Sequence, residues 1–225
     1  MIDYTFQWGV ILPHLPYLLG GAWVTLHLTF SGFMLGLIIG ILAAVAQVYG
    51  TTFLRRIVTA YVIFFTNTPS LVTAFFLFFG LPEFGIVISP YNCILINLAL
   101  NAGAYLADVF RGGINSVRKP ELEAAQVMGF SLLQQVQYVI APHIAKTQYG
   151  PISNLYIIFI LGSALASIFG VEELTGRAFN LDAELFRSLE IYTILAGLYV
   201  ALTIVASTVL KLIGRYCFRI KTRVL

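Results

Sequence analysis

The sequence predicts an all-α membrane protein with five transmembrane helices. Of its 225 residues, 59% are hydrophobic and only 10% are charged, and the mean hydropathy is +0.90. A soluble domain could not bury so many large apolar side chains in its interior. The charged residues also leave uncharged runs of about 20 residues, the length that a helix needs to cross about 30 Å of hydrocarbon. Membrane lipid is therefore the first expected partner.

The uncharged runs place the spans along a single domain, residues 1–225, because no internal repeat or linker divides the chain. Pro13 and Pro16 are unsuited to a helix interior, so the first span is expected to begin after them. The predicted spans are residues 20–49, 57–82, 88–111, 147–170 and 190–213. A short additional helix is expected outside the membrane, around residues 181–187.

Basic residues predict the orientation in the membrane. One set of connections contains Arg55, Arg56, Arg111, Arg118, Lys119, Lys211, Arg215, Arg219, Lys221 and Arg223, whereas the other contains Arg177 and Arg187. An excess of Lys and Arg marks cytoplasmic loops, so the N-terminus is expected outside and the C-terminus in the cytoplasm. The acidic outer segment 172–190 either docks an extracytoplasmic receptor or is a solvated loop. No basic cluster alternates with stacking aromatics, so nucleic acid is not expected as a partner.

The segment 119–142, KPELEAAQVMGFSLLQQVQYVIAP, predicts two short cytoplasmic helices joined by a sharp bend. Pro120 suits the first helical position, and Glu121 lies where the helix dipole favours a carboxylate. Gly129 can end a helix in the left-handed conformation. Ser131 followed by Gln134 matches a capping box at the start of the second helix. From this local chemistry alone, the segment could also be an ordinary amphipathic helix at the membrane surface.

The pattern Glu123-Ala124-Ala125, Gly129, Ile140 and Pro142 resembles the EAA motif of ABC-importer permeases. Other strings extend the resemblance to the polar amino-acid branch of that family over about residues 60–175. They are Thr68-Pro69, Phe79-Gly80-Leu81-Pro82, LNAGAYLADVFRGGI at residues 100–114, and Gly170-Val171-Glu172-Glu173-Leu174-Thr175. The resemblance implies a type I ABC-importer permease fold in a bacterial inner membrane. It also implies transport of a polar amino acid by alternating access.

The resemblance assigns roles to the EAA residues and names partners. Glu123, Ala124, Ala125 and Gly129 would contact a cytoplasmic ATPase, and Pro142 would shape the return to the bilayer. The implied partners are an ABC ATPase dimer, a second permease subunit that is identical or homologous, and an extracytoplasmic amino-acid-binding protein. ATP and Mg would be bound by the ATPase, and this chain would hold no cofactor.

Polar residues within the spans are candidates for the substrate path. In the third span Asn97, Asn101, Tyr105 and Asp108 recur on one helical face, which should meet protein or water rather than lipid. Asn97 serves either the path or hydrogen bonding between helices. By the resemblance, Asn101 and Tyr105 are expected to line the path, while Asp108 is expected to pair with Arg111.

Two further spans add candidates to this path. Pro69 cannot donate to the carbonyl of Phe65, so the second span should loosen near Thr68 and expose polar backbone, either as a simple kink or as part of the path. In the fourth span Ser163 is either a path residue or a packing residue, whereas Gly162 and Ser167 are expected to pack against other helices.

The chain departs from the family pattern in charge. Many relatives carry an acidic residue and an Arg where Ile63 and Thr66 stand here, and a Lys-Asp pair in place of Leu161-Gly162. Without these charges, either a sister permease supplies the charged site or the solute is weakly charged overall.

No enzyme constellation emerges from the sequence. The histidines His14, His27 and His143 are far apart, with no other ligand at metal-binding spacing. A phosphate-binding loop ending in Gly-Lys-Ser/Thr is also missing, so neither catalysis nor ATP hydrolysis is expected of this chain. The alternatives to the ATP-driven permease are an ATP-independent channel or secondary transporter and, third, a membrane enzyme or a structural subunit.

Overall fold

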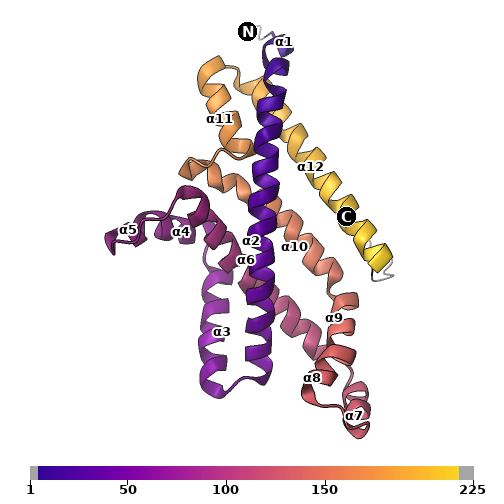
Figure 1. The fold of residues 1–225 in the computed structure, drawn as a ribbon. Helices are drawn as coiled ribbons and strands as arrows, with labels where there is room; N and C mark the ends of the chain where they lie inside the picture. The colour runs from indigo at the N-terminus through magenta and orange to yellow at the C-terminus, as the bar shows by residue number, and fades with distance from the viewer. Residues whose placement is uncertain (1–4, 218–225) are drawn as a thin grey trace.

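A computed structural model describes residues 5–217, which form helices and turns with no strand in that range (Figure 1). The first half contains α1 (Trp8–Ile11), η1 (Leu12–His14), α2 (Leu15–Tyr49), α3 (Thr52–Asn67), α4 (Ser70–Phe75), η2 (Phe76–Gly80), α5 (Leu81–Glu83) and α6 (Pro90–Asn115). The second half contains α7 (Lys119–Val127), α8 (Leu132–Gln135), η3 (Val136–Ile140), α9 (Ala141–Thr147), α10 (Tyr149–Gly162), η4 (Ser163–Phe169), α11 (Leu174–Leu185) and α12 (Ser188–Cys217). The all-α prediction is confirmed.

Four continuous helical segments of the described chain are long and apolar enough to cross a membrane. They are Trp8–Tyr49, Pro90–Asn115, Tyr149–Phe169 and Ser188–Cys217. A fifth crossing exists only if the bent pair Thr52–Asn67 and Ser70–Glu83 is counted as one span. The predicted count of five therefore holds in that sense, but the predicted span 57–82 is not one straight helix.

The helical pair α2 and α6 forms the centre of the bundle. A Cβ atom built on Gly36 of α2 would lie only 2.5 Å from the Cβ of Ala102 on α6, and one on Gly40 would lie 2.7 Å from the Cβ of Leu106. Glycine at these positions lets the two backbones approach closely, as small residues do in membrane helix pairs. The predicted first and third spans are thus fastened together along this seam.

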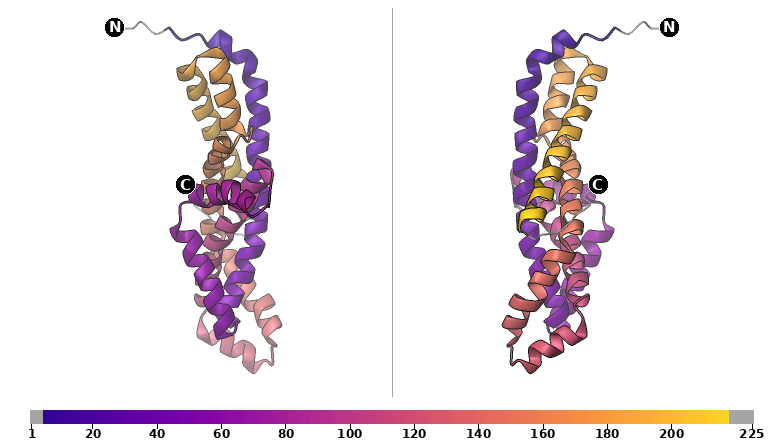
Figure 2. Two further views of the ribbon diagram at one scale, coloured as in Figure 1. Left: turned by 90° about the vertical axis from the view of Figure 1, so that its left-hand side faces the viewer. Right: turned by 90° about the vertical axis from the view of Figure 1, so that its right-hand side faces the viewer.

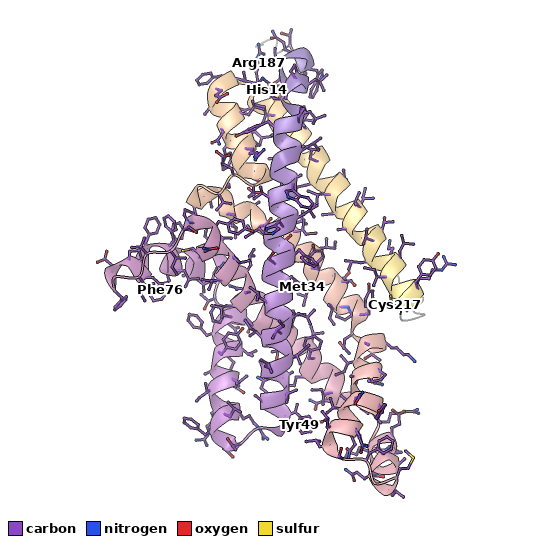
Figure 3. All side chains as sticks on the ribbon, viewed as in Figure 1. His14, Met34, Tyr49, Phe76, Arg187 and Cys217 are labelled. Carbon is purple, nitrogen blue, oxygen red and sulfur yellow. The ribbon has the colours of Figure 1, made fainter. Side chains whose placement is uncertain are left out.

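The chain turns by 107° between α3 and the segment Ser70–Glu83, which projects as a side arm (Figure 1). The sequence predicts a loosened helix at Pro69, and the structure has a complete break at Thr68–Pro69 instead. Pro69 is extended, with φ −55° and ψ 132°, and it precedes the first residue of α4. Phe76, labelled in Figure 3, belongs to this arm and is 62% exposed.

Both π-helices of the described chain stand two residues before a proline. η2 ends at Gly80 and is followed by Pro82, and η3 ends at Ile140 and is followed by Pro142. Proline has no N–H for the i→i−4 ladder, and its ring clashes with the carbonyl four residues earlier. A wider turn before it removes that conflict without ending the helix. Pro142 therefore shapes the entry into α9, in the place predicted for the return to the bilayer.

The two ends of the molecule are formed by different helices (Figure 2). One end carries α11, near the start of α12, and the other end carries α7 and α8. The predicted outer helix around 181–187 is placed too late, because α11 runs from Leu174 to Leu185. Three basic residues of the orientation argument, Arg219, Lys221 and Arg223, lie outside the described residues.

Candidate translocation and coupling sites

A polar cavity of about 510 Å³ opens where α3 breaks and meets α6 and α10. Its lining includes the five consecutive residues Thr66 to Ser70 at the break, Asn101 and Tyr105 from α6, and Gly162 from α10. The remaining lining residues, Leu98, Leu155, Ile158 and Phe159, are apolar. Amide, hydroxyl and backbone groups supply all of its polarity, because no lining residue carries a formal charge.

An amide network from α6 holds the side arm in place behind this cavity. The Thr73 hydroxyl donates to Asn97 Oδ1, and Asn97 Nδ2 donates to the Ser70 carbonyl at 3.2 Å. Asn101 Nδ2 lies 3.3 Å from Thr73 Oγ1 and 3.1 Å from Asn97 Oδ1. Asn97 and Asn101 are both buried. Asn97 therefore has the interhelical role that the sequence left open, and Asn101 combines that role with a place in the cavity wall.

The helix break leaves carbonyl groups that side chains partly satisfy. Tyr105 Oη lies 3.5 Å from the Thr66 carbonyl, at the limit of a hydrogen bond. The Thr66 hydroxyl donates to the Val62 carbonyl at 2.7 Å and Asn67 Nδ2 to the Ile63 carbonyl at 2.8 Å, but these two carbonyls lie inside α3 and are not freed by the break. Broken backbone at membrane depth is tolerated where it lines a cavity, and here the break forms part of the cavity wall.

The predicted path residues are only partly brought together. Thr68, Pro69, Asn101 and Tyr105 all line the cavity. Ser163 does not: it is fully buried, and its hydroxyl donates to the Ile160 carbonyl at 2.8 Å. It begins the 3-10 helix η4, whose tighter winding changes which residues face the cavity. Gly162, predicted as a packing residue, lines the cavity instead, with open space at its Cβ position.

At the end of the molecule away from α11, the helices α7 and α8 form a bent protrusion that we call the knob (Lys119–Gln135). Gly129 has φ +75°, the left-handed conformation predicted for it. The Phe130 N–H donates to the Ala125 carbonyl and the Gly129 N–H to the Gln126 carbonyl, so the end of α7 is capped. Ser131 and Gln134 form the predicted capping box of α8. The bend is therefore held by local hydrogen bonds.

The knob has an exposed apolar patch, although it lies at the tip of the molecule. Val127 is 89% exposed and Leu133 75%, and Met128 and Leu132 are also exposed. Such a patch on a protruding element marks a site of contact with a protein or with the membrane surface. These residues were not among the predicted contacts, although the apolar letters around Gly129 were a signal for them.

Ala125 differs in exposure from the other residues of the predicted coupling set. Glu123, Ala124 and Gly129 are exposed, whereas Ala125 is 0% exposed. Successive residues point about 100° apart around a helix. When Ala124 faces outward, Ala125 therefore turns toward the interior of the knob. Its side chain is buried within the chain, and its coupling role stays a prediction.

The knob is joined to the bundle through the segment after it. Ile140 of η3 is buried, and the Ser116 hydroxyl at the end of α6 lies 2.9 Å from His143 Nε2 on α9.

The predicted pair of Asp108 and Arg111 near the end of α6 is confirmed at 2.9 Å.

The outer helix α11 is anchored by a buried carboxylate that the sequence analysis placed in an exposed acidic segment. Glu173 is 0% exposed, and it caps α11 by accepting the Gly176 N–H at 2.9 Å. Thr25 of α2 and Tyr199 of α12 donate their hydroxyls to Glu173 Oε2 at 3.0 and 3.1 Å. Glu173 is therefore unavailable to a receptor, whereas its neighbour Glu172 is exposed.

Burial raises the pKa of the Glu173 carboxyl, although hydrogen bonds from the Thr175 and Gly176 backbone and from Thr25 and Tyr199 partly lower it. Among the described residues, no Lys or Arg forms an ion pair with it. Hydrogen-bond donors from three helices, α2, α11 and α12, thus surround this carboxyl. The polar residues that signalled this network in the sequence were Thr25, near the start of the first predicted span, and Tyr199, near the middle of the last.

Comparison with known proteins decides the family. The family described as "Binding-protein-dependent transport system inner membrane component" matches residues 36–217. The chain belongs to this family. Over 212 residues, the permease is 32% identical to the glutamine transport system permease protein of Escherichia coli (strain K12), with 93% of this chain and 97% of the relative covered. It is 31% identical over 205 residues to a probable amino-acid ABC transporter permease protein of Bacillus subtilis (strain 168), covering 91% of each.

Solved structures agree with the family assignment. The permease matches a chain of the "Crystal structure of an amino acid ABC transporter with histidines" with a TM-score of 0.87 and 28% identity, covering 94% of this chain and 99% of that chain. It also matches a chain of an inward-facing methionine ABC transporter with a TM-score of 0.70 and 19% identity, covering 89% and 98%. The latter likeness concerns the fold alone. The predicted fold of an ABC-importer permease is confirmed.

Proposed function

We propose that this permease imports a polar amino acid as one half of a permease pair driven by a separate ABC ATPase dimer and supplied by an extracytoplasmic binding protein. ATP and Mg would be bound by the ATPase, and the chain itself would catalyse no reaction. The knob carries the proposal, because an exposed apolar surface at the tip of a rigid bend suits a docking element. The amino-acid transport names of the relatives support the class of cargo.

Coupling is proposed to run through Glu123, Ala124 and Gly129, together with the exposed apolar residues Val127 and Leu133. When nucleotide closes the ATPase pair, two docked knobs would move together and rock the bundles between inward- and outward-facing states. The capping box and the left-handed Gly129 favour transmission, because they hold the bend rigid. Pro142 and the buried Ile140 continue the rigid path into α9 and α10.

The orientation proposed is N-terminus outside and C-terminus in the cytoplasm, in a bacterial inner membrane. The knob would then lie in the cytoplasm beside Arg118 and Lys119, and α11 would lie outside. The excess of basic residues at the end of α6, the start of α3 and the end of α12 supports this orientation.

The cargo is proposed to be an amino acid whose side chain is uncharged. The cavity offers hydroxyl, amide and carbonyl groups without a charge, so it suits neutral hydrogen-bonding groups. The charged ends of an amino acid would then be met by the second permease or by freed backbone groups. Tyr105→Phe removes a hydroxyl from the cavity wall. It is expected to raise the KM for uptake several-fold, while Ser163→Ala, behind the wall, leaves it unchanged.

Reconstitution tests the whole proposal. The complex is placed in proteoliposomes with ATP inside and binding protein outside, and uptake is measured with a panel of amino acids. We expect ATP-dependent uptake, and Glu123→Lys should abolish the stimulation of ATPase activity by loaded binding protein while leaving membrane insertion intact. Uptake that persists after ATP depletion would favour the alternative, an ATP-independent channel or secondary transporter.

A further inference from the structure

A long apolar groove runs along the side of the bundle between α2, α10 and α12. Its volume is about 600 Å³, and Leu26, Met34 and Val205 are among its lining residues (Met34 is labelled in Figure 3). Along α2 the lining extends from Leu19 to Leu37. That interval is about 27 Å long at 1.5 Å per residue, close to the roughly 30 Å of bilayer hydrocarbon.

A second apolar groove continues the first toward the cytoplasmic side. It has a volume of about 380 Å³ and lies between α2, α6 and the segment from η3 to α10. Leu37, Tyr149 and Ile152 line both grooves, so the two form one trough. We call the two together the lateral trough.

Three basic residues lie next to residues at the junction of the two grooves, where Tyr149 is found. Tyr149 Oη donates to the Leu210 carbonyl at 2.6 Å, and its ring packs on Gly214, where a Cβ would lie 2.6 Å away. Lys211 and Arg215 directly follow these two residues of α12, and Lys146 precedes Tyr149 by one turn. None of the three forms an ion pair with any residue that the structure describes. The outer end of α12 differs, because Glu190 lies there 3.8 Å from Arg187.

The lateral trough and the polar cavity occupy different faces of α10. Ile152, Ser153 and Tyr156 face the trough, whereas Leu155, Phe159 and Gly162 face the cavity. The proposed function directs the cavity toward the second permease, and this step rests on it. The trough then faces lipid, and the basic residues beside Tyr149 offer positive charge to a lipid of the cytoplasmic leaflet.

We propose that the lateral trough is a binding site for an anionic glycerophospholipid of the cytoplasmic leaflet. Its acyl chains lie between α2, α10 and α12, and its phosphate is held by Lys146, Lys211 and Arg215. The groove between α2, α10 and α12 is apolar and has these basic residues beside its Tyr149 end, so it matches such a lipid in both parts. A bound lipid would also fill the space into which α12 diverges from α2 (Figure 1).

The charge requirement is tested by native mass spectrometry of the intact complex with its ATPase. The delipidated complex is titrated with phosphatidylglycerol and with phosphatidylcholine of the same acyl chains. The unchanged complex should bind phosphatidylglycerol more tightly. The double variant Lys211→Gln with Arg215→Gln should weaken that binding by about fivefold for each charge removed. Equal binding of the two lipids by the unchanged complex would overturn the proposal.

Arg118→Gln with Lys119→Gln is the matched control, because it removes two cytoplasmic positive charges from the knob and none from the trough. It should leave phosphatidylglycerol binding unchanged. A loss equal to that of the trough variant would mean that only general membrane charge is being measured, which contradicts a site. Gel filtration of both variants verifies that the complex remains assembled.

The apolar part is tested by filling the trough. Ala201 lines it, whereas the neighbouring Val200 is exposed and outside it. Ala201→Phe should lower the binding of both lipids, and Val200→Phe should lower neither. An equal effect of the two variants would count against the trough as the site.

The occupant is identified with a photo-crosslinking residue at Val205, which lines the trough and is 62% exposed. A phospholipid adduct supports the proposal. A crosslink to the second permease would overturn it, since the trough would then be a subunit interface. These measurements need no ATP, amino acid or binding protein. Failed uptake would therefore count against the proposed function and not against the lipid site.

Discussion

Helix α11, proposed to lie outside, and the knob, proposed to lie in the cytoplasm, are both short helical elements beyond the spans, and they are held in opposite ways. The outer helix is held by long-range hydrogen bonds, in which Glu173 meets Thr25, 148 residues earlier, and Tyr199, 26 residues later. The knob is held by bonds between near neighbours, such as Ser131 with Gln134. The outer helix is therefore an integral part of the bundle, whereas the knob is a locally folded protrusion with an exposed apolar patch.

Removal of the buried carboxylate should have the largest effect on stability. Glu173→Ala leaves the Thr25 and Tyr199 hydroxyls without their acceptor and uncaps α11, at a cost of about 2–4 kcal/mol. Thermal unfolding of the purified complex measures it. The control is Glu172→Ala, an exposed neighbour whose loss should change stability by less than about 0.5 kcal/mol. Similar unfolding temperatures for the two variants would contradict the claim that the long-range hydrogen bonds of Glu173 hold α11 in the bundle.

Gly129→Pro should have a smaller effect on stability and a large one on coupling. Proline fixes φ near −65°, so it cannot adopt the φ of +75° that the bend requires, and the local cost is about 1–3 kcal/mol. Because the bend is local, the spans should unfold at an almost unchanged temperature while ATPase stimulation is lost. A proline at another glycine, such as Gly112→Pro, is unsuitable as a control because it would break helix α6. Gly129→Ala, which keeps the N–H, should retain part of the stimulation.

Leu133→Ser should leave stability within about 0.5 kcal/mol of the parent, because the side chain is already 75% exposed. Its effect should appear in assembly, as weaker association of the ATPase in a pull-down from detergent. Tyr138→Ser, on the exposed part of η3 beyond the knob, serves as comparison and should weaken association less. Full association of the ATPase with the Leu133 variant would mean that the apolar patch is not part of the docking surface.

The smallest expected effect is a pH dependence confined to the outer helix. The folded-state pKa of Glu173 is raised, so folding favours the protonated form of this carboxyl. Its contribution to stability is complete below the unfolded-state pKa and is lost as the pH rises through the folded-state pKa. The unfolding temperature of the parent relative to Glu173→Gln should therefore fall as the pH is raised through that window. A relative rise with pH would mean that the hydrogen bonds outweigh burial.

The contrast also explains what the sequence could predict. The bend of the knob follows from residues that act on their neighbours, and Gly129, Ser131 and Gln134 adopt their predicted conformations and bonds. The spans follow from uncharged runs. The Glu173 network depends on which helices meet, so the same letters were compatible with an exposed acidic loop. The orientation of Ala125 and of Ser163 likewise depends on helix rotation, which no local pattern determines.

The seam between α2 and α6 has a mechanical consequence. With no side chain on Gly36 or Gly40 to act as a spacer, the two backbones interlock, and sliding one along the other would drive Ala102 and Leu106 into the opposing main chain. The two helices therefore behave as one rigid unit. Helix α6 ends at Asn115, and α7 begins only a few residues later, at Lys119. In the proposed coupling, a push on the knob would therefore move α2 and α6 together and tilt the first span, and the two helices would not slide past each other.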